Sequence, residues 1–150
     1  MAFLAGFLSE AEIAQALVHA ATAVGFEPGR QGTGYEKHPL APGGPLDPLV
    51  ARLRGALPSD ANDAWDAYLL RYRDGAYVPP HVDPIAGGAH VRLNVLLRGG
   101  QEGSGGLYLG GDRVALLVGD AVRFRSDRVI HEVREVRGER LVLSVGCLVA

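Results

Sequence analysis

The chain has 150 residues, of which 47% are hydrophobic, and its formal net charge is −2. This length suits one domain with a sizeable core, since a folded domain of this size buries roughly 70% of the surface that its unfolded chain exposes. The nearly balanced charge gives no electrostatic footprint for nucleic acid or for a membrane surface, so we expect neither as a partner.

The apolar start of the chain, Met1 to Leu8, does not resemble a secretion signal. It has no basic beginning and no cleavage site, and Glu10 and Glu12 follow it directly. No apolar run is long enough to span a bilayer. The single cysteine, Cys147, lies in an apolar stretch and is expected to be a buried hydrophobe rather than a redox group. These features predict a cytoplasmic protein.

Two helices are expected in the first part of the chain. Ser9 and Glu12 have the spacing of a capping box, and apolar residues follow at helical intervals as far as Val24, with Gly25 as a candidate C-cap. A second, shorter helix is predicted from about Leu46 to Leu57, because its leucines fall on one side.

The segment between these helices, Pro28 to Pro45, is rich in glycine and proline and carries Tyr35, Lys37 and His38. A connection this long without regular structure is unusual in a compact domain, and such segments are functional lids or mobile loops. The sequence leaves both interpretations open.

From Trp65 onward the pattern changes to short strands. The expected strands are 65–72, 91–97, 106–109, 114–117, 121–124, 130–136 and 140–148, with turns at 110–112 and 137–139. Many short strands with glycine-rich turns indicate a sandwich or barrel, and the preceding helices are expected to buttress one sheet. We therefore expect one domain over residues 1–150, with a helical part at about 8–57 and a strand-rich part at about 65–149.

A metal site is suggested by His81 and Asp83, which follow a Pro-Pro pair. On an extended strand these two side chains point to the same face, because side chains alternate with a period of two. A His-x-Asp pair alone is more often surface decoration, but His131 begins a later strand. Two histidines and one carboxylate on one side of a metal leave the opposite positions open, which suits non-heme Fe(II) and O2.

Arg140 adds weight to this hypothesis. It follows His131 across a turn at Gly138 and shares one strand face with Val142 and Ser144. Arginine on so apolar a strand is costly to bury without a partner. It either pairs with a nearby acid or binds a ligand carboxylate through two parallel hydrogen bonds, with Ser144 adding a third. The spacing to His131 favours the second interpretation.

Together these residues resemble the Fe(II)- and 2-oxoglutarate-dependent oxygenases, and among them the prolyl hydroxylase branch. The resemblance covers about Tyr68 to Val149 and rests on His81-Val82-Asp83, the run Ser126 to Val133, Arg140, Ser144 and the lead-in Tyr72-Arg73-Asp74-Gly75. The strand 91–97 lacks the tyrosine that oxygen-sensing members place near its end, which leaves the basic chemistry intact and the substrate open.

The resemblance implies a mainly β fold, a double-stranded β-helix or jelly roll, buttressed by the two helices. It implies that His81, Asp83 and His131 are catalytic and ligate Fe(II). Arg140, helped by Ser144, would bind the distal carboxylate of 2-oxoglutarate, and Tyr72 would line the co-substrate pocket. The implied activity is that of a dioxygenase, which uses O2 and 2-oxoglutarate to hydroxylate an aliphatic carbon.

The implied substrate is a prolyl residue of a peptide or protein, or an amino-acid-like small molecule. Arg92, Asn94 and Arg128 are candidate substrate residues at the pocket mouth, although solvated positions at strand ends account for the two arginines equally well. His90 is expected to lie in a loop and outside the metal site. Nothing in the sequence indicates an oligomeric state.

Two other functions remain open. The first is a non-catalytic metal-binding jelly roll that acts as a sensor or binding module, which would need no carboxylate clamp such as Arg140. The second is a cupin-like metalloenzyme that works without a keto acid. Cupin-like sites usually favour additional histidines and often a glutamate ligand.

Overall fold

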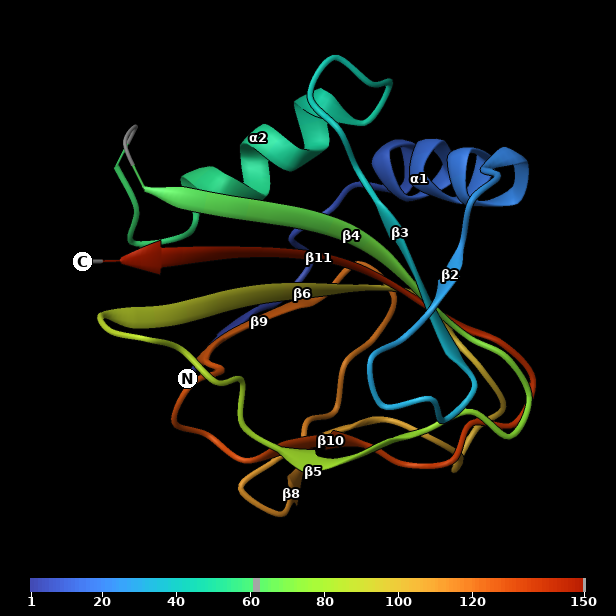
Figure 1. The fold of residues 1–150 in the computed structure, drawn as a ribbon. Helices are drawn as coiled ribbons and strands as arrows, with labels where there is room; N and C mark the ends of the chain where they lie inside the picture. Colours follow the sequence, from blue (N-terminus) through green and yellow to red (C-terminus); the bar gives the residue numbers. More distant parts are fainter. Residues whose placement is uncertain (61–62, 150) are drawn as a thin grey trace.

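The structure is a computed structural model that describes residues 1–60 and 63–149. Two antiparallel β-sheets face each other, and two helices cover the outer face of the larger sheet (Figure 1). This is the mainly β architecture with two buttressing helices that the sequence predicts. No helix of the described chain is long and apolar enough to cross a bilayer.

The secondary structure consists of two helices and eleven strands within the described residues. In chain order these are β1 (Ala2–Leu4), α1 (Glu10–Thr22), β2 (Glu27–Pro28), β3 (Tyr35–Pro39), α2 (Asp47–Gly55), β4 (Ala64–Tyr72), β5 (Val78–His81), β6 (Ala89–Gly99), β7 (Leu107–Leu109), β8 (Asp112–Arg113), β9 (Ala121–Arg125), β10 (His131–Val133) and β11 (Arg140–Val149).

The two sheets differ in size and in what they carry. The major sheet has the order β1-β9-β6-β11-β4-β3-β2, and the minor sheet has the order β5-β10-β7-β8. The last strand, β11, lies at the centre of the major sheet between β6 and β4. Strands that are distant in sequence therefore lie side by side, and the two sheets enclose the space in which the candidate site lies.

The first helix begins as the sequence predicts and ends earlier. The Ser9 hydroxyl accepts from the Glu12 N–H, and the Glu12 carboxylate accepts from the Ser9 N–H, which completes the capping box. The helix ends at Thr22 with Ala23 as its C-cap, so the prediction of Gly25 in this role is wrong. Val24, predicted on the buried face, lies outside the helix and is 86% exposed.

Hydrophobic side chains gather on both faces of the major sheet. One core lies between the sheet and the helices, and β11 contributes Leu141, Leu143 and Val145 to it. The other core lies between the two sheets, and Val142 belongs to it. The period of two along β11 therefore sends alternate residues to separate cores, and Arg140 and Ser144 lie on the face that looks toward the minor sheet.

The segment 28–45 was expected to lack regular structure, and this prediction is wrong. Tyr35–Pro39 forms strand β3, which pairs with β4 along its length and with β2 at the sheet edge. The expected strand 114–117 is also wrong, because the second strand of that hairpin covers only Asp112 and Arg113. The short strands β1 and β2 were not predicted, and the extended segment expected at His81 and Asp83 ends as β5 at His81. These short elements depend on pairing with distant strands, which local sequence patterns do not report.

Candidate metal centre

His81 and His131 lie directly opposite each other in the minor sheet. His81 is the last residue of β5, His131 is the first of β10, and the two are register partners. Their ring centroids are 4.2 Å apart. Directly opposed residues of an antiparallel pair place their side chains on the same sheet face. Two histidines that are far apart in sequence therefore meet between the sheets.

Asp83 completes the cluster from just beyond the end of β5. The expectation that it lies on a strand with His81 is wrong, because β5 ends at His81. Its backbone N–H donates to the Ser126 carbonyl at 2.8 Å, which fixes the chain there. Its Oδ1 is 3.4 Å from His81 Nε2 and 3.6 Å from His131 Nε2. One ligand atom from each of the three residues lies within 4.8 Å of the others.

Both histidine rings are oriented by their other nitrogen. His81 Nδ1 is 2.9 Å from the Pro79 carbonyl oxygen, and His131 Nδ1 is 2.9 Å from the Val129 carbonyl oxygen. A carbonyl oxygen can only accept, so each Nδ1 carries a proton and donates it, and Nε2 is the nitrogen left to bind a metal. Such backbone contacts hold the rings of metal-ligating histidines. Both Nε2 atoms face the Asp83 carboxylate.

The electrostatics of the cluster favour an ionised carboxylate. Burial alone raises the pKa of Asp83, but hydrogen bonds from His131, His81 and Ser126 outweigh it, so the pKa lies well below its usual range. The hydrogen bond to Asp83 also raises the pKa of His81, against the opposing effect of burial. An ionised carboxylate and imidazole nitrogens are the donor set that a divalent cation such as Fe(II) takes.

His90 lies beside this cluster without belonging to it. It was expected in a loop, but it is the second residue of β6. Its Nδ1 is 3.5 Å from Asp83 Oδ2, the carboxylate oxygen that does not face the other two histidines. Burial, followed by the positive charge of Arg92, lowers the pKa of His90, so the ring is held in its neutral form. A neutral ring there can orient the carboxylate of Asp83.

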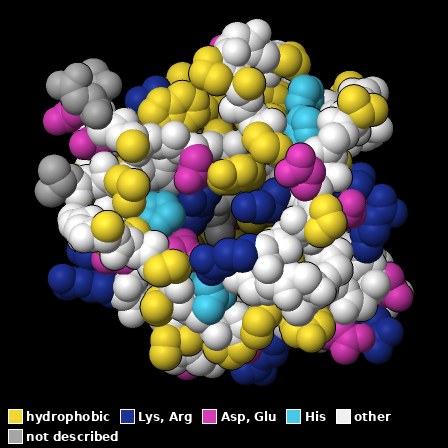
Figure 2. All heavy atoms as spheres, viewed as in Figure 1, with side chains coloured by type: hydrophobic (Ala, Val, Ile, Leu, Met, Phe, Trp, Pro, Cys, Tyr) yellow, Lys and Arg dark blue, Asp and Glu magenta, His cyan; other side chains and the backbone are white. Residues whose placement is uncertain are grey.

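An open cavity of about 250 Å³ lies over the three residues. In Figure 2 lysine and arginine side chains surround a hollow on this face of the molecule. The lining side chains come from both sheets and from the segment before β3, and they are Arg30, Gln31, Tyr35, Lys37, Asp66, Tyr68, Leu70, Tyr72, Val78, His81, Asp83, Arg92, Asn94, Leu107, Phe124, His131, Glu132, Val133 and Ser144.

Arg140 begins β11 opposite Tyr72 of β4 and is 4% exposed. Within residues 1–60 and 63–149, no carboxylate forms an ion pair with it, so the interpretation of a structural ion pair does not hold there. Its guanidinium lies 5.5 Å from the centroid of the Tyr72 ring, which lines the cavity, although Arg140 itself does not. Burial lowers the pKa of Arg140 and raises the pKa of Tyr72 to about 12.

The expected ligand hydroxyl, Ser144, is fully buried and already engaged on both sides. It donates to Asn94 Oδ1 at 2.6 Å and accepts from Arg92 Nε at 3.0 Å. Arg92 also donates to Asp66 at 2.8 Å, so its charge is compensated. The candidate substrate residues Arg92 and Asn94 thus line the cavity as one network with Ser144.

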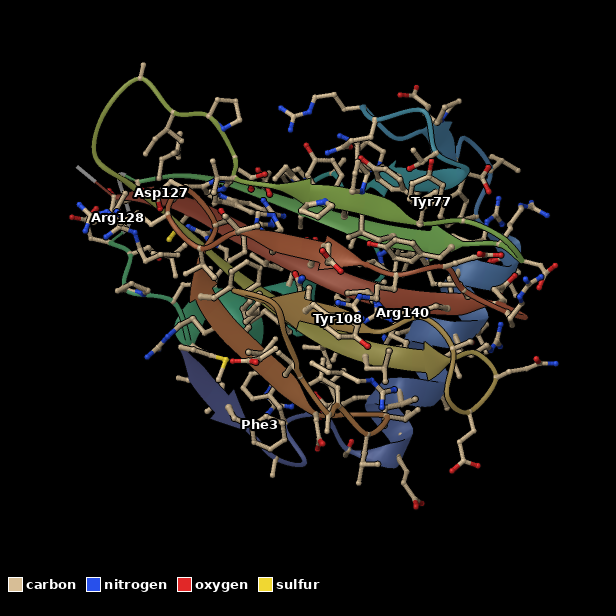
Figure 3. The ribbon with its side chains drawn as sticks, turned by 90° about the horizontal axis from the view of Figure 1, so that it is seen from below. Phe3, Tyr77, Tyr108, Asp127, Arg128 and Arg140 are labelled. Carbon is tan, nitrogen blue, oxygen red and sulfur yellow. The ribbon has the colours of Figure 1, made fainter. Side chains whose placement is uncertain are left out.

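The third candidate substrate residue, Arg128, lies elsewhere. It is exposed and does not line the cavity. Figure 3 places it with Asp127 at one end of the strands, whereas Arg140, the first residue of β11, lies toward their other end. The structure therefore separates Arg128 from the other candidate site residues.

Sequence reasoning missed the contribution of the first half of the chain to this cavity. Arg30, Gln31, Tyr35 and Lys37 come from the segment around β2 and β3, and the rings of Tyr35 and Tyr72 stack at 5.7 Å. Tyr35 and Lys37 alternate with Glu36 along the strand, which was a detectable signal. The glycines and prolines around them concealed it.

No protein-family model matches the sequence, and no curated protein matches it. Solved structures do match. A prolyl-4-hydroxylase from Pseudomonas putida is 22% identical with a TM-score of 0.74, over 99% of this chain and 92% of that one. The viral collagen prolyl hydroxylase vCPH from Paramecium Bursaria Chlorella virus-1, in complex with 2-oxoglutarate, is 20% identical with a TM-score of 0.76, over 99% and 95%.

A third structure is HygX from Streptomyces hygroscopicus with nickel and 2-oxoglutarate bound. It is 15% identical with a TM-score of 0.77, over 99% of this chain and 82% of that one. At these identities the likeness establishes the fold. The prediction of a jelly roll buttressed by two helices is thereby confirmed.

Proposed function

We propose that this protein is an Fe(II)- and 2-oxoglutarate-dependent dioxygenase that hydroxylates an aliphatic carbon, with residues 1–150 forming one catalytic domain. The observation that carries the proposal is the convergence of His81, Asp83 and His131 between the two sheets, with their ligand atoms within 4.8 Å of one another. The buried Arg140, on the adjoining strand face, supports it as a carboxylate-binding residue.

The residues present fit the proposed metal. Both imidazole Nε2 atoms and the ionised carboxylate converge from one side, and the cavity covers the other. This is the arrangement that leaves coordination positions open for small ligands. Fe(II) held there would supply the oxygen chemistry that converts 2-oxoglutarate to succinate and CO2 and inserts one oxygen atom into a C–H bond.

The remaining residues would bind and orient the keto acid. Arg140, whose charge no described carboxylate compensates, would pair with its distal carboxylate by two parallel hydrogen bonds. Tyr72, whose ring lines the cavity beside Arg140, would line the pocket of the keto acid. Ser144 would contribute its hydroxyl by exchanging one of its present contacts with Asn94 or Arg92.

The substrate proposed from the fold is a prolyl residue in a peptide or protein, or an amino-acid-like small molecule. Two similar structures are of prolyl hydroxylases, and a third, HygX, has a crystal structure with hygromycin B bound, so proteins of this fold differ in the molecules that they bind or act on. A cytoplasmic location and the absence of nucleic acid and membrane partners remain part of the proposal. Cell fractionation and a nucleic-acid binding assay test them.

The decisive experiment is an anaerobic titration of the Fe(II)-loaded protein with 2-oxoglutarate, followed by visible absorbance. A weak metal-to-ligand charge-transfer band is expected with the wild-type protein, and a large loss of that band at the same keto acid concentration is expected with Arg140→Ala. If iron is bound and no band forms, a metal sensor or a cupin-like enzyme that needs no keto acid becomes the better reading.

A further inference from the structure

Two cations on the cavity wall have no ion-pair partner among the described residues. They are Arg30, in the turn after β2, and Lys37, on β3. The third cation on the wall, Arg92, differs from them, because it is 2.8 Å from the Asp66 carboxylate. The ammonium nitrogen of Lys37 is 4.9 Å from the centroid of the Tyr68 ring. The ring faces only one side of the ammonium group, so its other side is available to a ligand.

The local backbone sends these cations to the cavity. Lys37 lies two residues after Tyr35 on β3, so both side chains face the cavity, while Glu36 points away and pairs with Arg71 and Arg73. The turn that carries Arg30 packs closely on the Tyr35 ring, because any side chain at Gly29 would overlap that ring. Gly29 also donates its N–H to the Tyr35 carbonyl at 2.8 Å.

The proposed metal and co-substrate do not require these charges. Fe(II) carries two positive charges and Arg140 carries one. The carboxylate of Asp83 and the two carboxylates of 2-oxoglutarate carry three negative charges, so this set is neutral by itself. Glu132, also on the wall, is 2.7 Å from Arg134. The positive charges of Arg30 and Lys37 are therefore not compensated by the proposed metal and keto acid or by Glu132.

The cavity is small for a peptide segment. Its volume of about 250 Å³ must hold the keto acid as well as the reacting part of the substrate, and it lies below the range of roughly 300–1,000 Å³ in which drug-sized ligands bind. A compact substrate fits this space better than an extended chain does.

We propose that the substrate is a small molecule with an oxyanion, a carboxylate or a phosphate, which Arg30 and Lys37 bind above the metal site. This inference rests on the proposed function and narrows it, since an internal prolyl residue carries no charge. Arg30 and Lys37 are specificity-determining residues that fix one end of the substrate, so that a carbon further along it faces the metal.

The test measures binding to anaerobic protein loaded with Fe(II) and 2-oxoglutarate. The probes are matched pairs: L-proline and L-prolinamide, N-acetyl-L-proline and its amide, and O-phospho-L-serine and L-serine. The member of at least one pair that carries the additional oxyanion is expected to bind about tenfold or more tightly than its partner, because it gains a charge-assisted hydrogen bond. The first two pairs report a preference for carboxylate, and the third reports a preference for phosphate.

The variants Arg30→Gln and Lys37→Met are each expected to lose about tenfold in affinity for the preferred acid, and Lys37→Arg to keep most of it. Arg54→Gln, which removes a charge from α2 on the opposite side of the major sheet, is the matched control and should bind as the wild type does.

Two outcomes overturn the inference: equal binding of acids and amides, or failure of every oxyanion to bind. Both differ from failure of the proposed function, in which 2-oxoglutarate itself produces no absorbance band.

Discussion

Each histidine of the candidate triad is held by a hydrogen bond on the side away from the metal position. Because the Pro79 and Val129 carbonyls accept from the two Nδ1–H groups, turning either ring would break that bond. Asp83 is held in the same way through its backbone, by Ser126. The three ligand atoms are thus preorganised, and a metal ion would find them with little loss of side-chain entropy.

Replacing Asp83 or His131 by Ala should reduce Fe(II)-dependent succinate formation to background, because two remaining ligands hold the metal too weakly. The fold should survive, since both side chains are only partly buried and neither belongs to the two hydrophobic cores. Succinate assays and circular dichroism check the two parts. Asp112→Asn, in the exposed strand β8, is the control for loss of a carboxylate. Full activity in either site variant contradicts the ligand assignment.

Arg140→Ala should raise the 2-oxoglutarate concentration needed for half-maximal turnover by about 10- to 150-fold, which corresponds to the roughly 1.5–3 kcal/mol of a charged hydrogen bond. Arg140→Lys should recover part of this, because an ammonium keeps the charge and loses the planar fork. Steady-state kinetics at saturating iron measure both. An unchanged keto acid requirement in Arg140→Ala would place the clamp at another residue.

At the scale of elements, the sequence predicted the helix and the strand that have a strong local pattern, and it did not predict strands that form only by pairing with distant strands. The capping box at Ser9 and the alternation along β11 are encoded in consecutive residues, and both agree with the structure. Strand β5 contains Pro79 and Pro80, and β3 follows a glycine-rich stretch, so neither has the composition of a strand. Both form because a neighbouring strand pairs with them.

The same distinction explains which parts of the site were predictable. The candidate metal ligands and the candidate keto acid arginine were named from their spacing in the sequence; they are His81, Asp83, His131 and Arg140. Arg30 and Lys37 reach the cavity only because the β2–β3 hairpin lies against β4, and pairing across such sequence distances is invisible in local patterns.

The turn after β9 gives a prediction on acid stability. Asp127 accepts from Arg125 at 2.6 and 2.8 Å and from the His90 N–H at 3.2 Å, and the hydrogen bonds from Arg125 lower its pKa to about 2. A pKa lower in the folded than in the unfolded protein stabilises the fold above about pH 4, and this contribution is lost as the pH falls toward 2.

Asp127→Asn should therefore lower the free energy of unfolding at pH 7 by about 1–2 kcal/mol, a modest value because the side chain of Arg125 is 34% exposed. The difference between variant and wild type should shrink from pH 4 toward pH 2. Urea denaturation at pH 7, 4.5 and 3 tests this. A constant difference across these pH values would show that the charge of Asp127 is not the cause.

At the scale of the whole molecule, the two faces of the major sheet differ in what they carry. The core under the helices uses one face of the major sheet, and the cavity uses the other. The minor sheet contributes few buried residues and carries two of the three candidate ligands. A bound metal would therefore cross-link β5 and β10 within the minor sheet.

Saturation with Fe(II) under anaerobic conditions should raise the melting temperature. At a free metal concentration 100 times the dissociation constant the gain is about 2.7 kcal/mol, or about 5–10 °C for a domain of this size. Added 2-oxoglutarate should raise it further in the wild type and much less in Arg140→Ala. Thermal scans with and without metal measure these shifts. An equal gain in Asp83→Ala would place the metal elsewhere.

The direct opposition of His81 and His131 has a consequence for how such a protein can diverge. The pairing of β5 with β10 shifts register between His131 and Val133, yet the two histidines stay opposite each other, so an insertion or deletion next to either histidine would turn it to the far face of the sheet. The loops at the strand ends are free of this restriction. Insertions are therefore tolerable around residues 84–88 and 100–106, and new substrate ranges can arise there while the reactive centre keeps its geometry.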